Sequence, residues 1–444
     1  MSVIVQKFGG TSLADPARIQ RCAARAVAAR RAGHQVVVVV SAMGHTTDRL
    51  LDLAGALSRQ PNRRELDLLL TTGEQTSAAL MSMAIHSAGV DAISFSGHRL
   101  GIITDPVHCR ARIRSIDRQR IAEQLEFGRI VVAAGFQGIT EDGQVTTLGR
   151  GGSDLTAVAL AAALGVNESS GSCEIYTDVD GVLTADPRIV PDARKLGRIA
   201  YEEMLELASL GASVLHCRAA ICAQKYGVPL HIRHSAREGK GTFIMSTPLD
   251  TSSLESVAVV GCALTRDLVM ISLRGLPNPR KPRQGSAAQA IIFQKIAEAG
   301  VFIDDIVQTE VDQRADISFT SPRDDLDALQ DAVRLALAEI GEGEMAVRSG
   351  LAKVSAVGVG MRTHTGVAAT MFAALAEAGI GIRTITTSEI KISCIVDEAL
   401  GEEALRRVHG AFGLGQPAAQ PAPAENAGAV QIEVKSSAAR SAVQ

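Results

Sequence analysis

The stretch Val3-Ile4-Val5-Gln6-Lys7-Phe8-Gly9-Gly10-Thr11-Ser12 decides the fold of this chain. It begins with β-branched residues, which favour a strand, and Asp15-Pro16 soon afterwards favours the start of a helix. Glycines let backbone N–H groups approach an anion, a helix N-terminus adds partial positive charge, and a lysine adds a mobile cation. The stretch therefore predicts a phosphate-binding turn, although its lysine precedes the glycines, unlike that of a P-loop. A plain strand-to-helix turn beside an exposed lysine is the alternative.

Strand and helix patterns alternate along the chain on both sides of this turn. Val36 to Val40 is a continuous apolar run, which is typical of a strand buried on both faces. Further strands are predicted at residues 92–95, 130–134, 174–176 and 229–234, and helices at 17–32, 68–84 and 202–226. This alternation predicts a largely parallel sheet covered by helices on both faces.

Polar residues follow the second strand, where ligands bind in open α/β sheets. Ser41 comes directly after the valine run, and Thr47 lies six residues further on. Both side chains are candidates for holding a substrate. The alternative for Thr47, or for its neighbour Asp48, is a helix N-cap, and the two interpretations are compatible.

Glu74 belongs to the segment Thr71-Thr72-Gly73-Glu74-Gln75, with which we expect a helix to open. A carboxylate there binds a substrate ammonium or, in the simpler interpretation, stabilises the positive end of the helix dipole.

A second glycine-rich loop spans Leu148 to Asp154 and precedes an alanine-rich helix. Arg150 suits a carboxylate or phosphate through two parallel hydrogen bonds, and Asp154 can orient a lysine or hold Mg²⁺. A plain turn capped by Ser153 or Asp154 is the alternative. The later polar loop from Tyr176 to Arg188 can contact a nucleotide, or its Asp-Gly and Asp-Pro pairs only mark turns.

The C-terminal part contains an internal repeat. Ala297-Glu298-Ala299-Gly300 recurs as Ala376-Glu377-Ala378-Gly379, and each copy reads as strand, helix, strand, strand, helix. Two such units predict a paired ligand-sensing module or a repeat kept for oligomer packing. A tail rich in Ala, Pro, Gln and Ser begins at Gln416, and this composition predicts disorder.

Composition excludes several classes of protein. The net charge of −3 gives no electrostatic reason to bind nucleic acid or an anionic membrane. No run is long enough to cross a bilayer, and the N-terminus lacks the pattern of a signal peptide, so we expect a cytoplasmic protein. The seven cysteines form no CxxC pair and the ten histidines show no metal-ligand spacing, so reduced thiols and no protein-built metal site are expected.

Taken together, these motifs resemble those of the aspartate kinases of the amino acid kinase superfamily, which carry two C-terminal ACT domains. The resemblance covers residues 2 to about 415. It rests on motifs that occur in the family's order: Lys7 to Ser12, Val40 to Gly44, Thr72 to Glu74, Leu148 to Asp154, Ile175 to Arg188, Val357 to Arg362 and Thr387 to Ser393. It implies a three-layer α/β sandwich with a largely parallel sheet, the amino acid kinase fold, followed by two α+β ACT domains.

The resemblance also implies a reaction. MgATP would phosphorylate the β-carboxylate of L-aspartate, giving 4-phospho-L-aspartate, the first step toward lysine, threonine, methionine and diaminopimelate. ACT domains of this family pair across chains and bind lysine, threonine or both. We therefore expect ATP and Mg²⁺ as cofactors, aspartate as substrate, feedback by amino acids and a homo-oligomer formed through the ACT domains.

The motif match assigns roles residue by residue. Catalytic roles fall to Lys7 and Asp154. Aspartate binding falls to Ser41, Thr47, Glu74, Arg150 and Ser153. Nucleotide binding falls to Lys7, Phe8, Gly9, Gly10, Thr177, Asp178, Leu183, Arg188 and Ser213. Effector binding falls to Gln308, Ile385, Thr386 and Glu389.

Two departures from the family pattern concern the nucleotide. Leu183 replaces a usual tyrosine near the adenine, and Ser213 replaces a usual lysine that reaches the phosphates. They motivate one competing hypothesis, an amino-acid sensor on a kinase scaffold. A kinase for a glutamate-type acid is another. The joint presence of Thr47, Glu74 and Arg150 favours aspartate over the second, and retention of Lys7 and Asp154 argues against the first.

The expected domain limits follow from the motifs and from composition. The catalytic domain is predicted at residues 1–245, a linker at 246–262, the first ACT domain at 263–342, the second at 343–415, and the disordered tail at 416–444.

Overall fold

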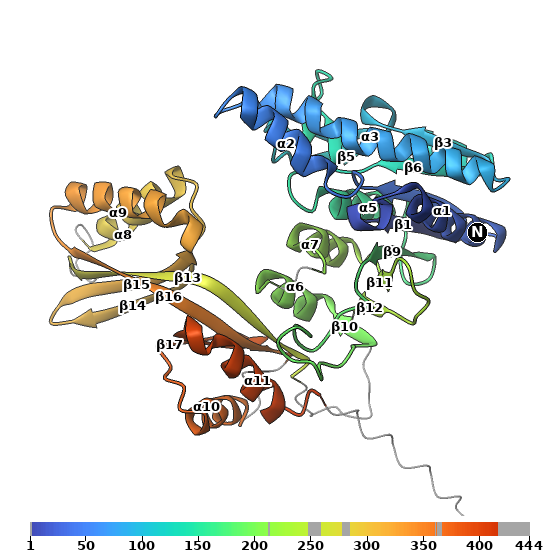
Figure 1. The fold of residues 1–444 in the computed structure, drawn as a ribbon. Coiled ribbons are helices and arrows are strands. Elements are labelled where there is room, and N and C mark those ends of the chain that lie inside the picture. Colours follow the sequence, from blue (N-terminus) through green and yellow to red (C-terminus); the bar gives the residue numbers. More distant parts are fainter. Residues whose placement is uncertain are drawn as a thin grey trace, which may run out of the picture.

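The computed structural model describes residues 2–211, 214–246, 259–277, 285–359, 361 and 366–415. The predicted linker core at 247–258, Ser213 and the predicted tail therefore lie outside the described residues. Residues 2–246 form one α/β unit, and residues 259–415 form a second unit around its own sheet (Figure 1).

An eight-stranded sheet organises the first unit. Its strand order is β10-β12-β11-β9-β1-β2-β6-β3, and only β12 and β10 run against the other six. The strands are β1 (Val3–Phe8), β2 (Gln35–Val40), β3 (Ala92–Phe95), β6 (Ile130–Ala134), β9 (Gly171–Thr177), β10 (Arg198–Ala200), β11 (Leu230–His234) and β12 (Thr242–Met245). The predicted largely parallel sheet is confirmed.

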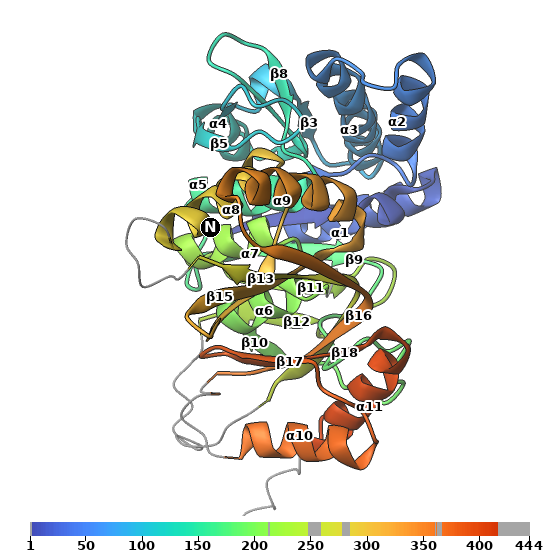
Figure 2. The same ribbon diagram turned by 90° about the vertical axis from the view of Figure 1, so that its left-hand side faces the viewer.

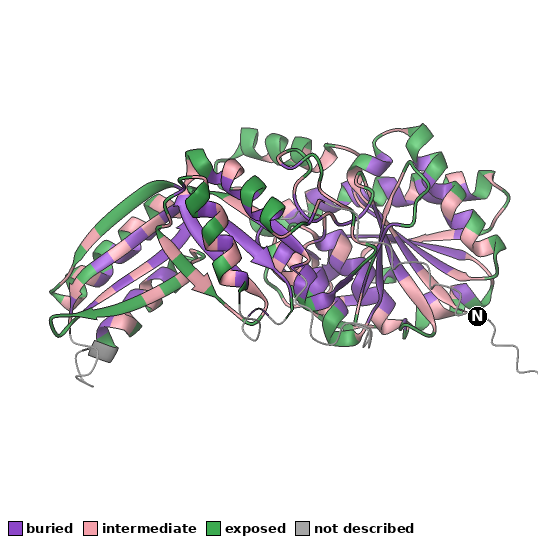
Figure 3. Cartoon of the chain, turned by 90° about the horizontal axis from the view of Figure 1, so that it is seen from below, coloured by how far each residue is buried: buried purple, intermediate pink, exposed green. Residues whose placement is uncertain are grey.

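Helices cover both faces of this sheet, which makes three layers. On one face α1 (Pro16–Arg31) and α3 (Arg63–Ser87) pack on β2, β3 and β6, and α2 (Thr46–Leu57) packs on α3. On the other face lie α4 (Gln119–Glu126), α5 (Gly152–Ala163) and α7 (Cys217–Tyr226), with α6 (Tyr201–Ser209) packed on α7. Alternate valines of β2 enter opposite cores, so the whole run is buried. Figure 3 shows that the strands of this unit are mostly buried, while the exposed residues lie mainly on the helices and loops around them.

A small second sheet flanks the three layers. Its order is β5-β4-β7-β8, built from β4 (Ile102–Thr104), β5 (Ile113–Ile116), β7 (Gln137–Ile139) and β8 (Val145–Thr147). Strand β8 leads directly into the second glycine-rich loop, so this sheet sets the direction from which the loop enters α5.

The C-terminal unit has a six-stranded antiparallel sheet with the order β14-β15-β13-β16-β18-β17. Its elements are β13 (Gly261–Leu276), α8 (Gly285–Glu298), β14 (Asp304–Val311), β15 (Arg314–Pro322), α9 (Leu326–Ile340), β16 (Glu344–Val357), α10 (Val367–Glu377), β17 (Thr384–Thr387), β18 (Lys391–Asp397) and α11 (Gly401–Ala411). Two copies of strand, helix, strand, strand, helix follow one another, which confirms the predicted repeat.

The long strands β13 and β16 run side by side through both copies (Figure 2). One core contains Leu273 of β13 with α8 and α9. The other contains Cys262, near the start of β13, together with Val354 of β16 and the helices α10 and α11. The first half of β13, which belongs to the first copy, is therefore part of the core of the second copy.

The two units share contacts. Ala185 and Val190, from the polar loop after β9, belong to the core formed with α10 and α11. The buried Thr184 hydroxyl lies 3.0 Å from Nε2 of His409 on α11. Lys391 of β18 pairs with Glu206 of α6 at 3.1 Å. The loop expected to meet the nucleotide is therefore anchored on the second repeat.

Three local expectations were wrong. Helix α3 begins at Arg63, not at Leu68, because the Asn62 side chain caps it by accepting hydrogen bonds from the N–H groups of Arg64 and Glu65. The helix predicted over 202–226 is two helices, α6 and α7. The residue before α2 is His45, so neither Thr47 nor Asp48 is an N-cap.

Candidate active site

Three loops meet at the carboxyl ends of β1, β2 and β6. The Ser41 N–H donates to the Phe8 carbonyl at 3.2 Å, and the Gly44 N–H donates to the Gly10 carbonyl at 2.9 Å. A Cβ on Gly10 would lie 2.8 Å from the carbonyl oxygen of Ala42, so no other residue fits there without a shift of the backbone. The sequence-predicted phosphate turn is therefore pressed against the segment that follows β2.

Lys7 and Asp154 form the polar centre of this edge. Lys7 lies near the end of β1 and Asp154 in the first turn of α5, and their Nζ and Oδ1 atoms are 2.7 Å apart. Their side chains are 12% and 13% exposed, so water screens this ion pair only weakly. A Cβ on Gly9 would lie 3.5 Å from Nζ of Lys7. The ammonium of Lys7 therefore lies directly beside the glycine turn.

The second glycine-rich loop turns sharply into α5 at Gly151. Gly151 has φ +70°, and a Cβ on it would lie 2.3 Å from the side chain of His216. Arg150, just before it, is exposed. Ser153 is buried, and its Oγ would lie 3.1 Å from a Cβ on Gly135, the residue that follows β6. The turn thereby leaves Arg150 at the surface and Ser153 inside the site.

Glu74 is buried in the middle of α3, the twelfth residue of the helix, so the helix-dipole interpretation is wrong. Its Oε1 accepts a hydrogen bond from the Ala42 N–H at 3.1 Å, while Oε2 has no hydrogen-bond donor among the described residues. Burial raises the pKa of Glu74 to about 7. A buried carboxylate oxygen without a partner is costly, and a bound ammonium would satisfy it.

Thr47 lies in the first turn of α2 and is half-buried, and Ser41 is half-buried at the end of β2. The start of α2 lies close to α3, since the methyl group of Thr46 would lie 3.6 Å from a Cβ on Gly73. Thr47, the next residue, therefore lies close to the part of α3 that carries Glu74.

The loop after β9 lies beside the phosphate turn. The Phe8 and Tyr176 rings stack with centroids 4.8 Å apart, and the Gly9 N–H donates to the Tyr176 carbonyl at 3.2 Å. Thr177 and Asp178 follow directly, with the Thr177 hydroxyl 3.1 Å from the Asp178 carboxylate. Both predicted nucleotide contacts thus stand next to Gly9.

The remaining nucleotide candidates lie further along this loop. Leu183 is half-buried and pairs with Lys195 in an isolated bridge. Arg188 is exposed and pairs with Asp186 at 2.6 Å, which raises the pKa of Arg188. In the described part of the chain no hydrogen bond joins Arg188 to the end of β1.

Several residues that sequence reasoning missed support the site. Asp67 is fully buried on α3 and accepts hydrogen bonds from the Thr147 hydroxyl at 2.5 Å and from the Cys109 N–H at 3.0 Å. His108 Nδ1 lies 2.7 Å from its other oxygen. Arg218 of α7 donates to the carbonyls of Leu148 and Ala111. These contacts fix the start of the loop that carries Arg150 and the segment 108–111 beside it. In the sequence, the only signal for them was an aspartate directly before the predicted helix 68–84.

The predicted effector residues lie on the C-terminal sheet. Gln308 is exposed on β14 and accepts a hydrogen bond from Gln289. On β17, Ile385 is exposed, and the Thr386 hydroxyl donates to the Asp305 carboxylate at 3.0 Å. Glu389 is exposed in the turn before β18. The structure brings Thr386 to the first repeat.

Comparison with known proteins agrees with this geometry. The model of the amino acid kinase family matches residues 2–234, and an ACT domain model matches residues 354–412. An aspartate kinase of Stutzerimonas stutzeri is 48% identical over 423 residues, which is 95% of this chain and 100% of that protein. The chain belongs to the aspartate kinase family. Aspartokinase 2 of Bacillus subtilis is 46% identical over 416 residues, 94% of this chain and 99% of that protein.

Solved structures of aspartate kinases share the whole fold. Escherichia coli aspartokinase III in complex with aspartate and ADP has a TM-score of 0.73 at 25% identity, covering 92% of this chain and 99% of that one. As a member of this family, the chain is an ATP-dependent kinase with ACT-type regulatory domains.

The described residues contain no group of three or more His, Cys, Asp or Glu side chains able to hold a metal ion. Among the same residues, no helix is long and apolar enough to cross a membrane.

Proposed function

We propose that this aspartate kinase phosphorylates the β-carboxylate of L-aspartate with MgATP to give 4-phospho-L-aspartate. One observation carries the proposal: Lys7 and Asp154 meet beside a glycine turn, at the same edge as the unsatisfied oxygen of Glu74. The relative from Escherichia coli was solved with aspartate and ADP, and the shared fold supports the same two ligands here.

Each end of aspartate meets a suitable partner. Glu74 Oε2 accepts from the substrate ammonium, because that oxygen is buried and has no donor among the described residues. Arg150 is exposed at the loop before α5 and holds a substrate carboxylate. Ser41, Thr47 and Ser153 add hydrogen bonds around it. An ammonium partner and a carboxylate partner together favour an amino acid over a simple acid.

The phosphoryl transfer needs little covalent help from the protein. The substrate carboxylate is already a nucleophile, so positioning and charge neutralisation dominate. Lys7 neutralises charge on the transferring phosphate, and Asp154 holds its ammonium in place. Gly9 and Gly10 border the same space, the Gly9 N–H is held by the Tyr176 carbonyl, and Phe8 orients the turn by stacking on Tyr176.

Mg²⁺ fits this site as a partner of the nucleotide. It is commonly bound by one or two carboxylates together with substrate phosphates. Asp154, which pairs with Lys7, and Asp178, which lies two residues after the Tyr176 carbonyl that accepts from Gly9, would hold the ion. When bound with the nucleotide, the ion would supply positive charge that neutralises the phosphates, and Thr177, Leu183 and Arg188 would border the nucleotide itself.

The finer biological assignments are part of the same proposal. The product opens synthesis of lysine, threonine, methionine and diaminopimelate in the cytoplasm. Lysine, threonine or both inhibit by binding near Gln308 and the segment 385–389, and the chain forms a homo-oligomer through its ACT domains. The limits 1–245, 263–342 and 343–415 describe the kinase and the two ACT domains.

The decisive experiment measures ATP turnover with Mg²⁺ and traps the acyl phosphate as a hydroxamate. We expect hydroxamate with aspartate and none with glutamate, and inhibition by lysine, threonine or their mixture. Equal product from glutamate would refute the substrate assignment. A folded, ATP-binding protein that makes no hydroxamate would instead indicate an amino-acid sensor.

A further inference from the structure

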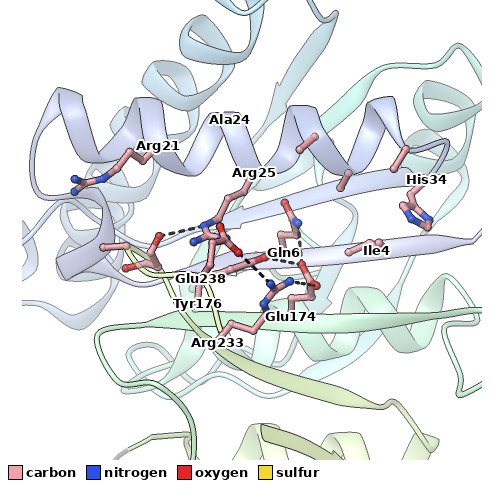
Figure 4. A pocket seen from close by; sticks show the side chains of 15 residues that line it. Ile4, Gln6, Arg21, Ala24, Arg25, His34, Glu174, Tyr176, Arg233 and Glu238 are labelled. Atoms are coloured by element: carbon pink, nitrogen blue, oxygen red, sulfur yellow. Dashed lines mark hydrogen bonds and ion pairs between the residues drawn. The ribbon is translucent and has the colours of Figure 1, made fainter. Parts of the chain in front are cut away.

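A cavity of about 620 Å³ opens on the face of the eight-stranded sheet, between α1 and the strands β9 and β11 (Figure 4). It is lined by residues whose side chains come from β1, α1, β9, β11 and the loop after β11. They include Gln6, Arg25, Glu174, Tyr176, Arg233 and Glu238. Apart from Tyr176, which stacks on Phe8, none of these residues has a role assigned above.

Glu174 forms the floor of the cavity. It is 7% exposed and accepts hydrogen bonds from Gln6 Nε2 at 2.8 Å, from the Tyr176 hydroxyl at 2.9 Å and from Arg233 Nη1 at 3.1 Å. Three donors satisfy this carboxylate, so it needs no further ligand. The network also fixes Gln6 and Arg233 on opposite sides of one carboxylate.

One polar atom of Gln6 lacks a hydrogen-bond partner. Its side chain is 2% exposed, and its Oε1 has no hydrogen-bond donor among the described residues, although Nε2 is used. A buried amide oxygen without a donor costs about 1–3 kcal/mol. Gln6 lines the cavity, so this acceptor lies beside the space that a ligand would enter, and a small rotation of the side chain would bring it into contact.

Glu238 shows which charge the cavity accepts. Its carboxylate lies 2.9 Å from Arg25 and 3.7 Å from Arg233, and both guanidinium groups lie over the Tyr176 ring, at 5.1 and 5.6 Å from its centroid. The arginine side chains are 15% and 24% exposed, whereas Glu238 is 80% exposed. An exposed loop side chain thus fills a built carboxylate position and can be displaced from it.

The opposite wall is apolar. Three exposed alanines line it at a spacing of four residues: Ala24 and Ala28 on α1, and Ala32 at the end of that helix. Small residues at this spacing leave one face of the helix open, so a carbon chain can lie against it.

We propose that this cavity binds a small organic acid that carries an amino or hydroxyl group near its carboxylate. The carboxylate takes the place of Glu238 between Arg25 and Arg233, the neighbouring donor group reaches Oε1 of Gln6, and the carbon part lies against the alanines of α1. The site is separate from the aspartate site, which lies at the carboxyl edge of the sheet.

The test uses a signal from inside the cavity. The chain has three tyrosines, Tyr176, Tyr201 and Tyr226, so the full-length protein labelled with 3-fluorotyrosine gives three ¹⁹F resonances. Tyr176→Phe identifies the first. L-lactate, L-alanine and propionate serve as probes, because propionate has the same carbon chain but no donor. Because Tyr176 also stacks on Phe8 of the phosphate turn, each titration is repeated with saturating aspartate and ADP, and a shift that these two ligands abolish is assigned to the catalytic site.

We expect lactate or alanine to shift the Tyr176 resonance saturably, and propionate to bind roughly tenfold more weakly, since one hydrogen bond is missing. Glu238→Gln removes the internal competitor and should strengthen binding severalfold. Arg25→Gln should weaken it roughly tenfold or more. Arg31→Gln is the matched control, because Arg31 is exposed on the same helix outside the cavity.

Two results would overturn the proposal. One is the absence of a saturable Tyr176 shift with every probe, even in the Glu238→Gln variant. The other is an unchanged preference for lactate over propionate in Gln6→Met, which keeps the length of the side chain but lacks Oε1. The resonance of buried Tyr201 reports in each variant whether the protein is folded.

Discussion

Among single residues, Lys7 is the side chain on which we expect phosphoryl transfer to depend most. Its ammonium is held by Asp154 and faces the glycine turn. We expect Lys7→Ala to lower kcat roughly 10²–10³-fold, as removal of one charge-stabilising group does in other enzymes. Aspartate affinity, measured by calorimetry, should change little because Glu74 and Arg150 remain. Near-normal turnover would refute the role given to Lys7.

Glu74 gives the enzyme a pH dependence. Burial raises its pKa to about 7, so the free enzyme carries a neutral acid there below that pH, and the neutral acid cannot pair with the substrate ammonium. The KM for aspartate should therefore fall as pH rises from 6 to 8. Glu74→Gln should raise KM at pH 8 by roughly tenfold or more and flatten the profile. An unchanged KM would exclude Glu74 as the ammonium partner.

The raised pKa of Glu74 also makes the stability of the folded protein depend on pH. The folded state holds the Glu74 proton more tightly than the unfolded chain, so the contribution of this group to the free energy of unfolding falls as pH rises from about 4.5 to about 7. Bound aspartate offsets that loss by supplying a partner for the ionised carboxylate.

At the scale of elements, Gly151 decides how the second glycine loop enters α5. We expect Gly151→Ala to lower kcat/KM strongly, because the added methyl group would lie 2.3 Å from the His216 side chain, so His216 or the loop that carries Arg150 must move. Gly165→Ala is the matched control: its φ is +75° and nothing lies within 4 Å of the new atom.

Both substitutions strain the backbone by about 1–2 kcal/mol, and thermal melts should show this for each. Only Gly151→Ala should lose activity in the hydroxamate assay. Equal activity losses in the two variants would mean that strain, not loop direction, is responsible.

The elements also show where prediction from sequence succeeds. The valine run predicted a central buried strand, and the structure confirms it, because burial of a continuous apolar run depends on local residues. The phosphate-binding role of the glycine turn stays a prediction. The start of α3 was missed, since the cap at Asn62 was overlooked and Glu74 was placed in a first turn. Asp67 was missed because its partners are distant in sequence: Thr147 is 80 residues away and meets it only in the folded chain.

At the scale of the whole molecule, Lys391 links the second ACT repeat to the kinase. It pairs with Glu206 at 3.1 Å, with side chains only 18% and 22% exposed. We expect Lys391→Gln to raise the effector concentration for half-inhibition severalfold while uninhibited kcat stays near normal. The control is Arg383→Gln, whose exposed partner, Asp397, lies within the same repeat. Unchanged inhibition would mean that coupling does not pass through this contact.

The repeat in the sequence predicted two units of one type, and their element order is confirmed. It did not predict how they join. Lys353 is buried between Asp304 and Asp305, at 2.6 and 3.0 Å, and Thr386 reaches Asp305 from the other side. The periodicity of the sequence does not predict this junction, because each of these residues fits the pattern of its own strand and the contacts between the strands form only in the folded chain.

The sharing of β13 and β16 has a consequence for how the regulatory half can be divided. Because the start of β13 completes the core of the later repeat, a protease cut or gene break near residue 343 would remove a strand from that core. Neither fragment would fold alone. Residues 259–415 should instead unfold in one cooperative transition. For the same reason, this segment should be excised, or fused to another enzyme, only as a whole.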